Sequence, residues 1–191
     1  MTTESSQVGN DAGVAPRSLP IPTRVTKQKI QDFAEGVRDQ CNLGSGFDIV
    51  DLVKANNGSV SYIGAFSKDQ TDSIIVNPDN SFEIRLSSSS SSLRDNFTLA
   101  HELGHYLLHW PKVRDAGSEN GMRATRAVNY EDSDLVRCEW EANWFAAAFL
   151  MPKDEFTDVV KSSGLDAASS IFGVSKMAAQ TRASDLGIDG I

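Results

Sequence analysis

Two histidines and a glutamate close together form the part of this sequence best suited to chemistry. His101 and His105 stand four residues apart, and Glu102 directly follows the first of them. On an α-helix, residues four apart project from one face, so both imidazoles can reach one metal ion at roughly 2.0–2.1 Å. Glu102 lies about 100° around that helix from His101, where it can accept a proton from an attacking water. The pattern predicts a hydrolytic zinc site with Glu102 as its general base.

The residues around this motif predict that it lies on a buried helix. An acidic capping box begins at Ser92, and Pro111 marks the expected end of the helix. Gly104 costs a helix roughly 1 kcal/mol relative to alanine, which indicates close approach of another backbone or of substrate. The apolar residues that give this helix its buried surface are Phe97, Leu99, Ala100, Leu103, Leu107 and Leu108.

A catalytic zinc ion needs a third protein ligand and one open position. His109 continues the spacing of the motif, but it lies roughly 12 Å along the helix axis from His101 and cannot close the same site. The chain contains three histidines in all. The remaining ligand is therefore expected to be a carboxylate or, as the lesser alternative, a cysteine thiolate.

A second predicted helix supplies candidates for that ligand. Glu139 and Asn143 stand four residues apart on one face, so Glu139 can bind the metal while Asn143 orients one of the histidines by a hydrogen bond. Glu141 points roughly 160° away from that face. We take Glu139 as the expected ligand and keep Glu141 and Cys138 as alternatives.

Two blocks of the sequence resemble the ImmA/IrrE family of bacterial and phage metallopeptidases. They are FTLAHELGHYLLH at residues 97–109 and EWEANWFAAAFLMP at residues 139–152, within a weaker resemblance over about residues 25–187. The resemblance implies a thermolysin-like zinc site. It also implies an endopeptidase that cleaves a helix-turn-helix repressor encoded nearby, which derepresses prophage, mobile-element or stress-response genes. Manganese is the alternative metal.

Several features remain open at this stage. A donor to the oxyanion of the reaction is expected, and Tyr106, Tyr130 and Arg123 are conceivable candidates. The rival function is a non-proteolytic regulatory protein that binds a repressor or DNA, with an idle or structural metal site. A structural zinc normally has four protein ligands, which argues against it. The net charge of −8 disfavours binding to DNA and to anionic membranes, so a protein partner is expected.

Hydrophobic periodicity predicts a mainly helical α+β fold of zincin-like type. The strands should form a small antiparallel sheet, and the last two helices a helix-turn-helix-like pair. The predicted helices cover about residues 25–41, 47–55, 92–111, 134–150, a segment starting at 152, 166–172 and 175–186, and the strands cover 59–66, 73–76 and 81–86.

The domain prediction is one metallopeptidase domain at residues 23–191, with segment 166–187 packed on it. Residues 1–22 are rich in Ser, Thr, Gly and Pro and are expected to form a flexible leader. Residues 112–134 show no period and predict a long loop, and the serine run at 87–92 predicts a flexible connector.

The first residues show no secretory signal, and the longest apolar stretch, residues 144–151, is too short to span a bilayer. The chain has two cysteines, too few for a disulfide framework, so both are expected to be reduced thiols. These observations predict a cytoplasmic protein.

Overall fold

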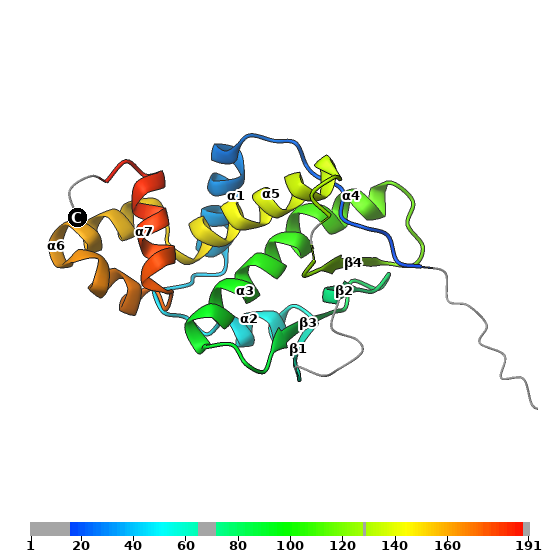
Figure 1. The fold of residues 1–191 in the computed structure, drawn as a ribbon, viewed down its shortest axis with the longest axis horizontal. Helices are drawn as coiled ribbons and strands as arrows, with labels where there is room; N and C mark the ends of the chain where they lie inside the picture. The colour runs from blue at the N-terminus through cyan, green and yellow to red at the C-terminus, as the bar shows by residue number, and fades with distance from the viewer. Residues whose placement is uncertain (1–15, 65–71, 128, 189–191) are drawn as a thin grey trace, which may run out of the picture.

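A long central helix organises the core of the protein. The computed structural model describes residues 16–64, 72–127 and 129–188. Helix α5 (Ser133–Leu150) packs against α1 (Lys27–Gln40) on one side and α3 (Ser92–Gly104) on another (Figure 1). Because α5 is contacted on several sides, much of its surface is apolar and buried, as expected for an internal helix.

The sheet lies against α3 and α2 (Ile49–Ala55) and is mixed rather than antiparallel. Strands β1 (Gly58–Ile63), β2 (Asp72–Val76), β3 (Phe82–Ser87) and β4 (Met122–Thr125) lie in the order β1-β3-β2-β4. Strand β2 pairs antiparallel with both β3 and β4, whereas β1 pairs parallel with β3.

The prediction of a wholly antiparallel sheet was wrong for β1, which pairs parallel with β3 and not with the next strand, β2. A tight turn joins β2 to β3, with the Asn77 N–H donating to the Ser81 carbonyl. Strand β1 therefore adds to the outer edge of β3. Strand β4 falls inside the predicted loop at 112–134 and was missed, since four residues are too few to show a period.

The helix that carries the histidine motif continues well past its predicted end. A π-helical turn, η1 (His105–His109), follows α3 and leads directly into α4 (Trp110–Asp115). Pro111 lies in the first turn of α4, directly after the π-helical turn, and lacks the N–H that a continuing α-helix would use. At the other end, Ser91 is the N-cap in place of Ser92, and it forms no capping hydrogen bond through its side chain.

Part of the predicted leader is ordered against the sheet. Residues 1–15 lie outside the described residues, but Ser18 forms a parallel bridge with Met122 in β4. Its N–H donates to the Gly121 carbonyl at 3.1 Å, and its own carbonyl accepts from the Arg123 N–H at 3.0 Å. Two buried prolines in this segment, at 20 and 22, restrict the unfolded chain and so reduce the entropy lost on ordering.

Two helices form the C-terminal pair at one end of the molecule (Figure 1). They are α6 (Lys153–Ile171), which breaks at Gly164 (φ 82°), and α7 (Lys176–Asp185), whose N-cap Ser175 accepts from the Ala178 N–H. The mainly helical α+β fold is thereby confirmed. Within the described ranges, no helix combines the length and apolar character needed to cross a membrane.

Candidate metal centre

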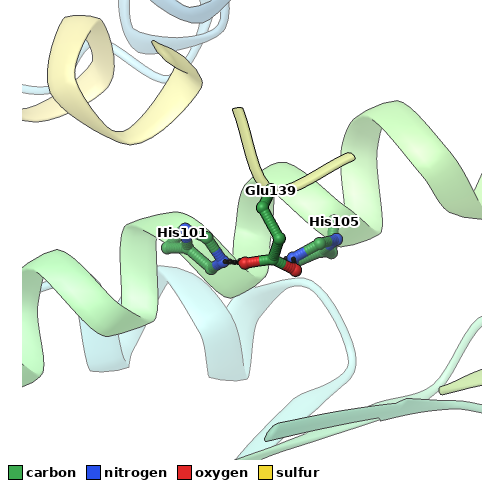
Figure 2. Close-up of side chains that lie close together, drawn as sticks. All are labelled: His101, His105 and Glu139. Atoms are coloured by element: carbon green, nitrogen blue, oxygen red, sulfur yellow. Dashed lines mark hydrogen bonds and ion pairs between the residues drawn. The ribbon is translucent and has the colours of Figure 1, made fainter. Parts of the chain in front are cut away.

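The structure brings His101, His105 and Glu139 together at the contact between α3, η1 and α5. Figure 2 shows the Glu139 carboxylate between the two imidazoles, with each oxygen 3.2 Å from one histidine Nε2 atom. The two Nε2 atoms are 3.1 Å apart. Ligand atoms around a tetrahedral zinc ion, each at about 2.0–2.1 Å, lie roughly 3.3 Å from one another. Two imidazole nitrogens 3.1 Å apart, and a carboxylate with one oxygen 3.2 Å from each of them, can therefore share a zinc ion.

A glycine allows the two ligand-bearing helices to approach so closely. A Cβ atom added at Gly104 would lie 3.1 Å from the Cα atom of Ala142 and 3.3 Å from the Cβ atom of Phe145. Such contacts are tighter than most side chains tolerate, so a larger residue would push α3 and α5 apart. This is the close backbone approach that a glycine inside a helix predicts.

Asn143 lies against the outer nitrogen of His101. Its Oδ1 atom is 3.0 Å from Nδ1 of His101. With the amide oxygen as acceptor, Nδ1 of His101 carries a proton, so Nε2 is the nitrogen left to bind a metal. A hydrogen-bonding partner of this kind holds a metal-binding imidazole in the correct tautomer.

Glu102 is buried beside the cluster and does not belong to it. Its side chain accepts a hydrogen bond from the Ser73 hydroxyl at 3.0 Å. Burial raises the pKa of this carboxyl to about 7, although the charge of His101 and the Ser73 hydrogen bond act in the opposite direction. Together with His101 and Glu139, Glu102 lines a cavity of about 300 Å³. A carboxyl group with a pKa near 7 can both accept and return a proton at neutral pH.

A second histidine–carboxylate pair lies behind His105, on the side away from the cavity. The Nδ1 atoms of His105 and His109 are 3.0 Å apart, and Nε2 of His109 is 3.2 Å from Oε2 of Glu141. His109 is outside the cluster, as expected, but its contact with His105 was not predicted. Glu141, an alternative ligand by sequence, faces away from the cluster. Burial lowers the pKa of His105 to about 3 and also lowers that of His109, so both rings are neutral.

Comparison with known proteins places these residues in a family. Residues 61–184 match the IrrE N-terminal-like domain, a family of peptidases, and this range contains His101, Glu102, His105 and Glu139. The chain belongs to this family. The ImmA/IrrE resemblance of the two sequence blocks is thereby confirmed, and with it membership of a metallopeptidase family.

The IrrE-like fold also has a counterpart among solved structures. The chain is similar to a Mycobacterium tuberculosis transcriptional regulator, with a TM-score of 0.56 and 17% sequence identity. The match covers 82% of this chain and 46% of that one, so the chain spans less than half the length of the regulator. At this identity the likeness concerns the fold alone. No curated protein matches the sequence.

On α5 of this IrrE-like protein, charge and burial make Glu139 a better metal ligand than Cys138. Burial acts to raise the pKa of Glu139, but the adjacent imidazoles of His101 and His105 outweigh it and hold the pKa well below its usual range, so the carboxylate is ionised. Cys138 is buried outside the cluster. Burial, reinforced by the charges of Glu141 and Glu139, raises the pKa of its thiol. A thiol that stays protonated is a poor metal ligand and a poor nucleophile.

The three oxyanion donors considered from the sequence do not line the cavity. Tyr106 stacks on Phe82 and donates to the Asn80 carbonyl, Arg123 pairs with Asp72 at 3.1 Å, and Tyr130 is 83% exposed. Arg126 does line the cavity, and its charge acts to lower the pKa of Glu102. It follows β4 inside the predicted loop, where no sequence pattern marked it.

Proposed function

We propose that this protein is a zinc-dependent endopeptidase in which His101, His105 and Glu139 bind the ion and Glu102 is the general base. The observation that carries the proposal is the cluster itself, with three ligand atoms within 4.8 Å of one another and a buried carboxyl group beside them in the same cavity. Two helices contribute three ligands, which leaves the fourth position of a tetrahedral ion open to the cavity. Manganese is the alternative ion.

Each residue of the site has a distinct role in peptide hydrolysis. Zinc, when bound, supplies Lewis acidity that polarises a peptide carbonyl and makes water a nucleophile near neutral pH. Glu102 accepts the proton of the attacking water and passes it to the leaving amine. Ser73 orients the Glu102 carboxylate, and Asn143 holds His101 with its lone pair towards the ion. The Arg126 guanidinium places positive charge on the cavity wall, where negative charge develops on the substrate oxygen.

We further propose that the substrate is a helix-turn-helix repressor encoded near this gene, cleaved in the cytoplasm. Membership of the IrrE-like family supports this. Cleavage of such a repressor would release the prophage, mobile-element or stress-response genes that it silences.

The direct test is to incubate the zinc-loaded protein with the helix-turn-helix protein encoded by the neighbouring gene. We expect the intact repressor to give two fragments, identified by mass spectrometry, and we expect a chelator to stop the reaction. A repressor that stays intact, together with sequence-specific retardation of DNA by this chain alone, would favour the regulatory binding function instead.

An apolar groove next to the metal cluster indicates where the rest of the substrate binds. It has a volume of about 690 Å³ and lies between α3, α5 and α7, with Leu93, Trp140 and Met177 among its lining residues. Arg94 and Thr98 line both this groove and the cavity of the cluster. Because the two hollows share lining residues, we assign the groove to an apolar stretch of the polypeptide substrate on one side of the scissile bond.

Replacing Met177 by Lys should raise the KM for the repressor about tenfold, equivalent to about 1.4 kcal/mol, with kcat unchanged. Met177 is 77% exposed, so the protein should fold normally. Ile171→Lys is the matched control, since Ile171 is 43% exposed and lies outside the groove. Equal KM values for the two variants in steady-state cleavage assays would remove the groove from the substrate site.

The alternative function, in which α7 binds DNA, finds little support in the basic residues of this helix. Arg182 is 1% exposed, donates to the Met151 carbonyl at 3.0 Å and pairs with Glu35 at 3.3 Å. Lys176 pairs with Asp166 at 2.7 Å. We therefore propose that segment 166–187 is packed on a single domain formed by residues 23–191 and serves its stability.

A further inference from the structure

We propose that Glu141, acting through His109, sets the tautomer of His105 and thereby its capacity to bind metal. The inference rests on the metal centre of the proposed function. It assigns a positioning role to two residues that the hydrolytic reaction does not use, and it explains why both are completely buried, at 0% exposure.

The Glu141 carboxylate is surrounded by hydrogen-bond donors. Its Oε1 atom accepts from Nε of Arg137 at 2.8 Å and from the Arg24 N–H at 2.9 Å. Its Oε2 atom accepts from both the N–H and the hydroxyl of Thr23, each at 2.8 Å, and lies 3.2 Å from Nε2 of His109. Donors on every side stabilise the ionised form, which carries no proton to give. His109 must therefore be the donor in its contact with Glu141.

The position of the proton on His109 determines the position of the proton on His105. A neutral imidazole has one N–H and one bare nitrogen, so a proton on Nε2 of His109 leaves its Nδ1 as an acceptor. Among the described residues, the polar partner at that Nδ1 is Nδ1 of His105, at 3.0 Å, which must then carry the proton. The Nε2 atom of His105 keeps its lone pair towards His101 and Glu139, as metal binding requires. The reverse order of protons would leave an N–H there, which cannot bind a metal.

The backbone at Thr23 and Arg24 is strained, and it binds Glu141 at the end of this hydrogen-bonded series that lies away from His105. Arg24 has φ 58°, in the left-handed region that residues other than glycine seldom adopt. This conformation directs the successive N–H groups of Thr23 and Arg24 at one carboxylate, an arrangement that binds anions. The π-helical turn places His109 behind His105, and such turns are frequent at functional sites. The left-handed conformation of Arg24 and the π-helical turn thus both contribute to one series of hydrogen bonds.

The first test compares zinc affinities by chelator competition. His109→Phe keeps a ring of similar shape and removes the acceptor for His105, so zinc should bind about 10- to 100-fold more weakly. Trp110→Phe is the matched control, because Trp110 is a neighbour with 2% exposure whose indole donates to Asn80 instead. Circular dichroism of both variants reports whether they fold. Equal affinity of folded His109→Phe and the control would overturn the proposal.

A second readout follows the protons themselves by ¹⁵N NMR of the zinc-loaded protein. We expect a proton on Nδ1 of His105, a scalar coupling across its hydrogen bond to Nδ1 of His109, and a proton on Nε2 of His109. Glu141→Gln offers an amide N–H₂ group to these donors, so it should disturb the His109 signals and weaken zinc binding. A proton on Nδ1 of His109 in the wild type would overturn the proposal. Neither test needs a peptide substrate, so absent cleavage would count against the proposed function alone.

Discussion

Replacing Glu102 by Gln should lower the rate of repressor cleavage by about 10²–10⁴-fold, the contribution of a general base, and should leave zinc binding intact. The amide has nearly the shape of the carboxyl group and can still accept from Ser73, but it cannot take a proton from water. Because Glu102 lies outside the ligand cluster, its replacement removes no bond to the ion.

Two measurements on the same preparation check this result. Single-turnover cleavage reports the chemical step, and elemental analysis after dialysis reports the zinc content. Glu131→Gln is the control, since Glu131 is exposed and away from the cavity; it should cleave at the wild-type rate. Undiminished cleavage by Glu102→Gln would exclude Glu102 as the base, whereas loss of zinc would show that its role is structural.

The features that sequence predicted well depend on neighbours along the chain. The spacing of His101 and His105, and of Glu139 and Asn143, places each pair on one helix face without any knowledge of the fold. Gly104 indicated a close helix contact because its cost within a helix needs compensation. Ser175 marked the start of α7 by the same local logic, and its side chain does accept from the Ala178 N–H.

The features that sequence missed depend on contacts between distant segments. Strand β1 pairs parallel with β3 on the edge that β2 does not occupy, and no local pattern reveals this pairing. Thr23 and Arg24 meet Glu141 across more than a hundred residues. The π-helical turn that brings His109 behind His105 has no period of its own, and a straight α-helix was assumed in its place. Sequence therefore indicated the proposed ligands and Asn143 beside His101, but not the contacts of Glu141 and His109 behind His105.

Replacing Glu139 by Ala should remove zinc from the protein. The carboxylate is ionised and lies 3.2 Å from both histidine Nε2 atoms, so it is the group that balances the charge of a divalent ion. Its loss leaves two neutral imidazoles, and the fall in affinity should exceed the roughly 10–100-fold caused by loss of an outer hydrogen-bonding partner. Zinc content by elemental analysis and affinity by chelator competition measure the effect.

The fold should survive this change, because the Glu139 side chain is 25% exposed and water can replace it. A cooperative thermal transition in the zinc-free variant checks that point, and Glu131→Ala, at an exposed position, should keep the zinc content of the wild type. If the Glu139→Ala variant retains its zinc, the third ligand would have to be assigned to Glu141. That carboxylate would then have to leave Thr23, Arg24 and His109 to reach the ion, which ¹⁵N signals of His109 would report.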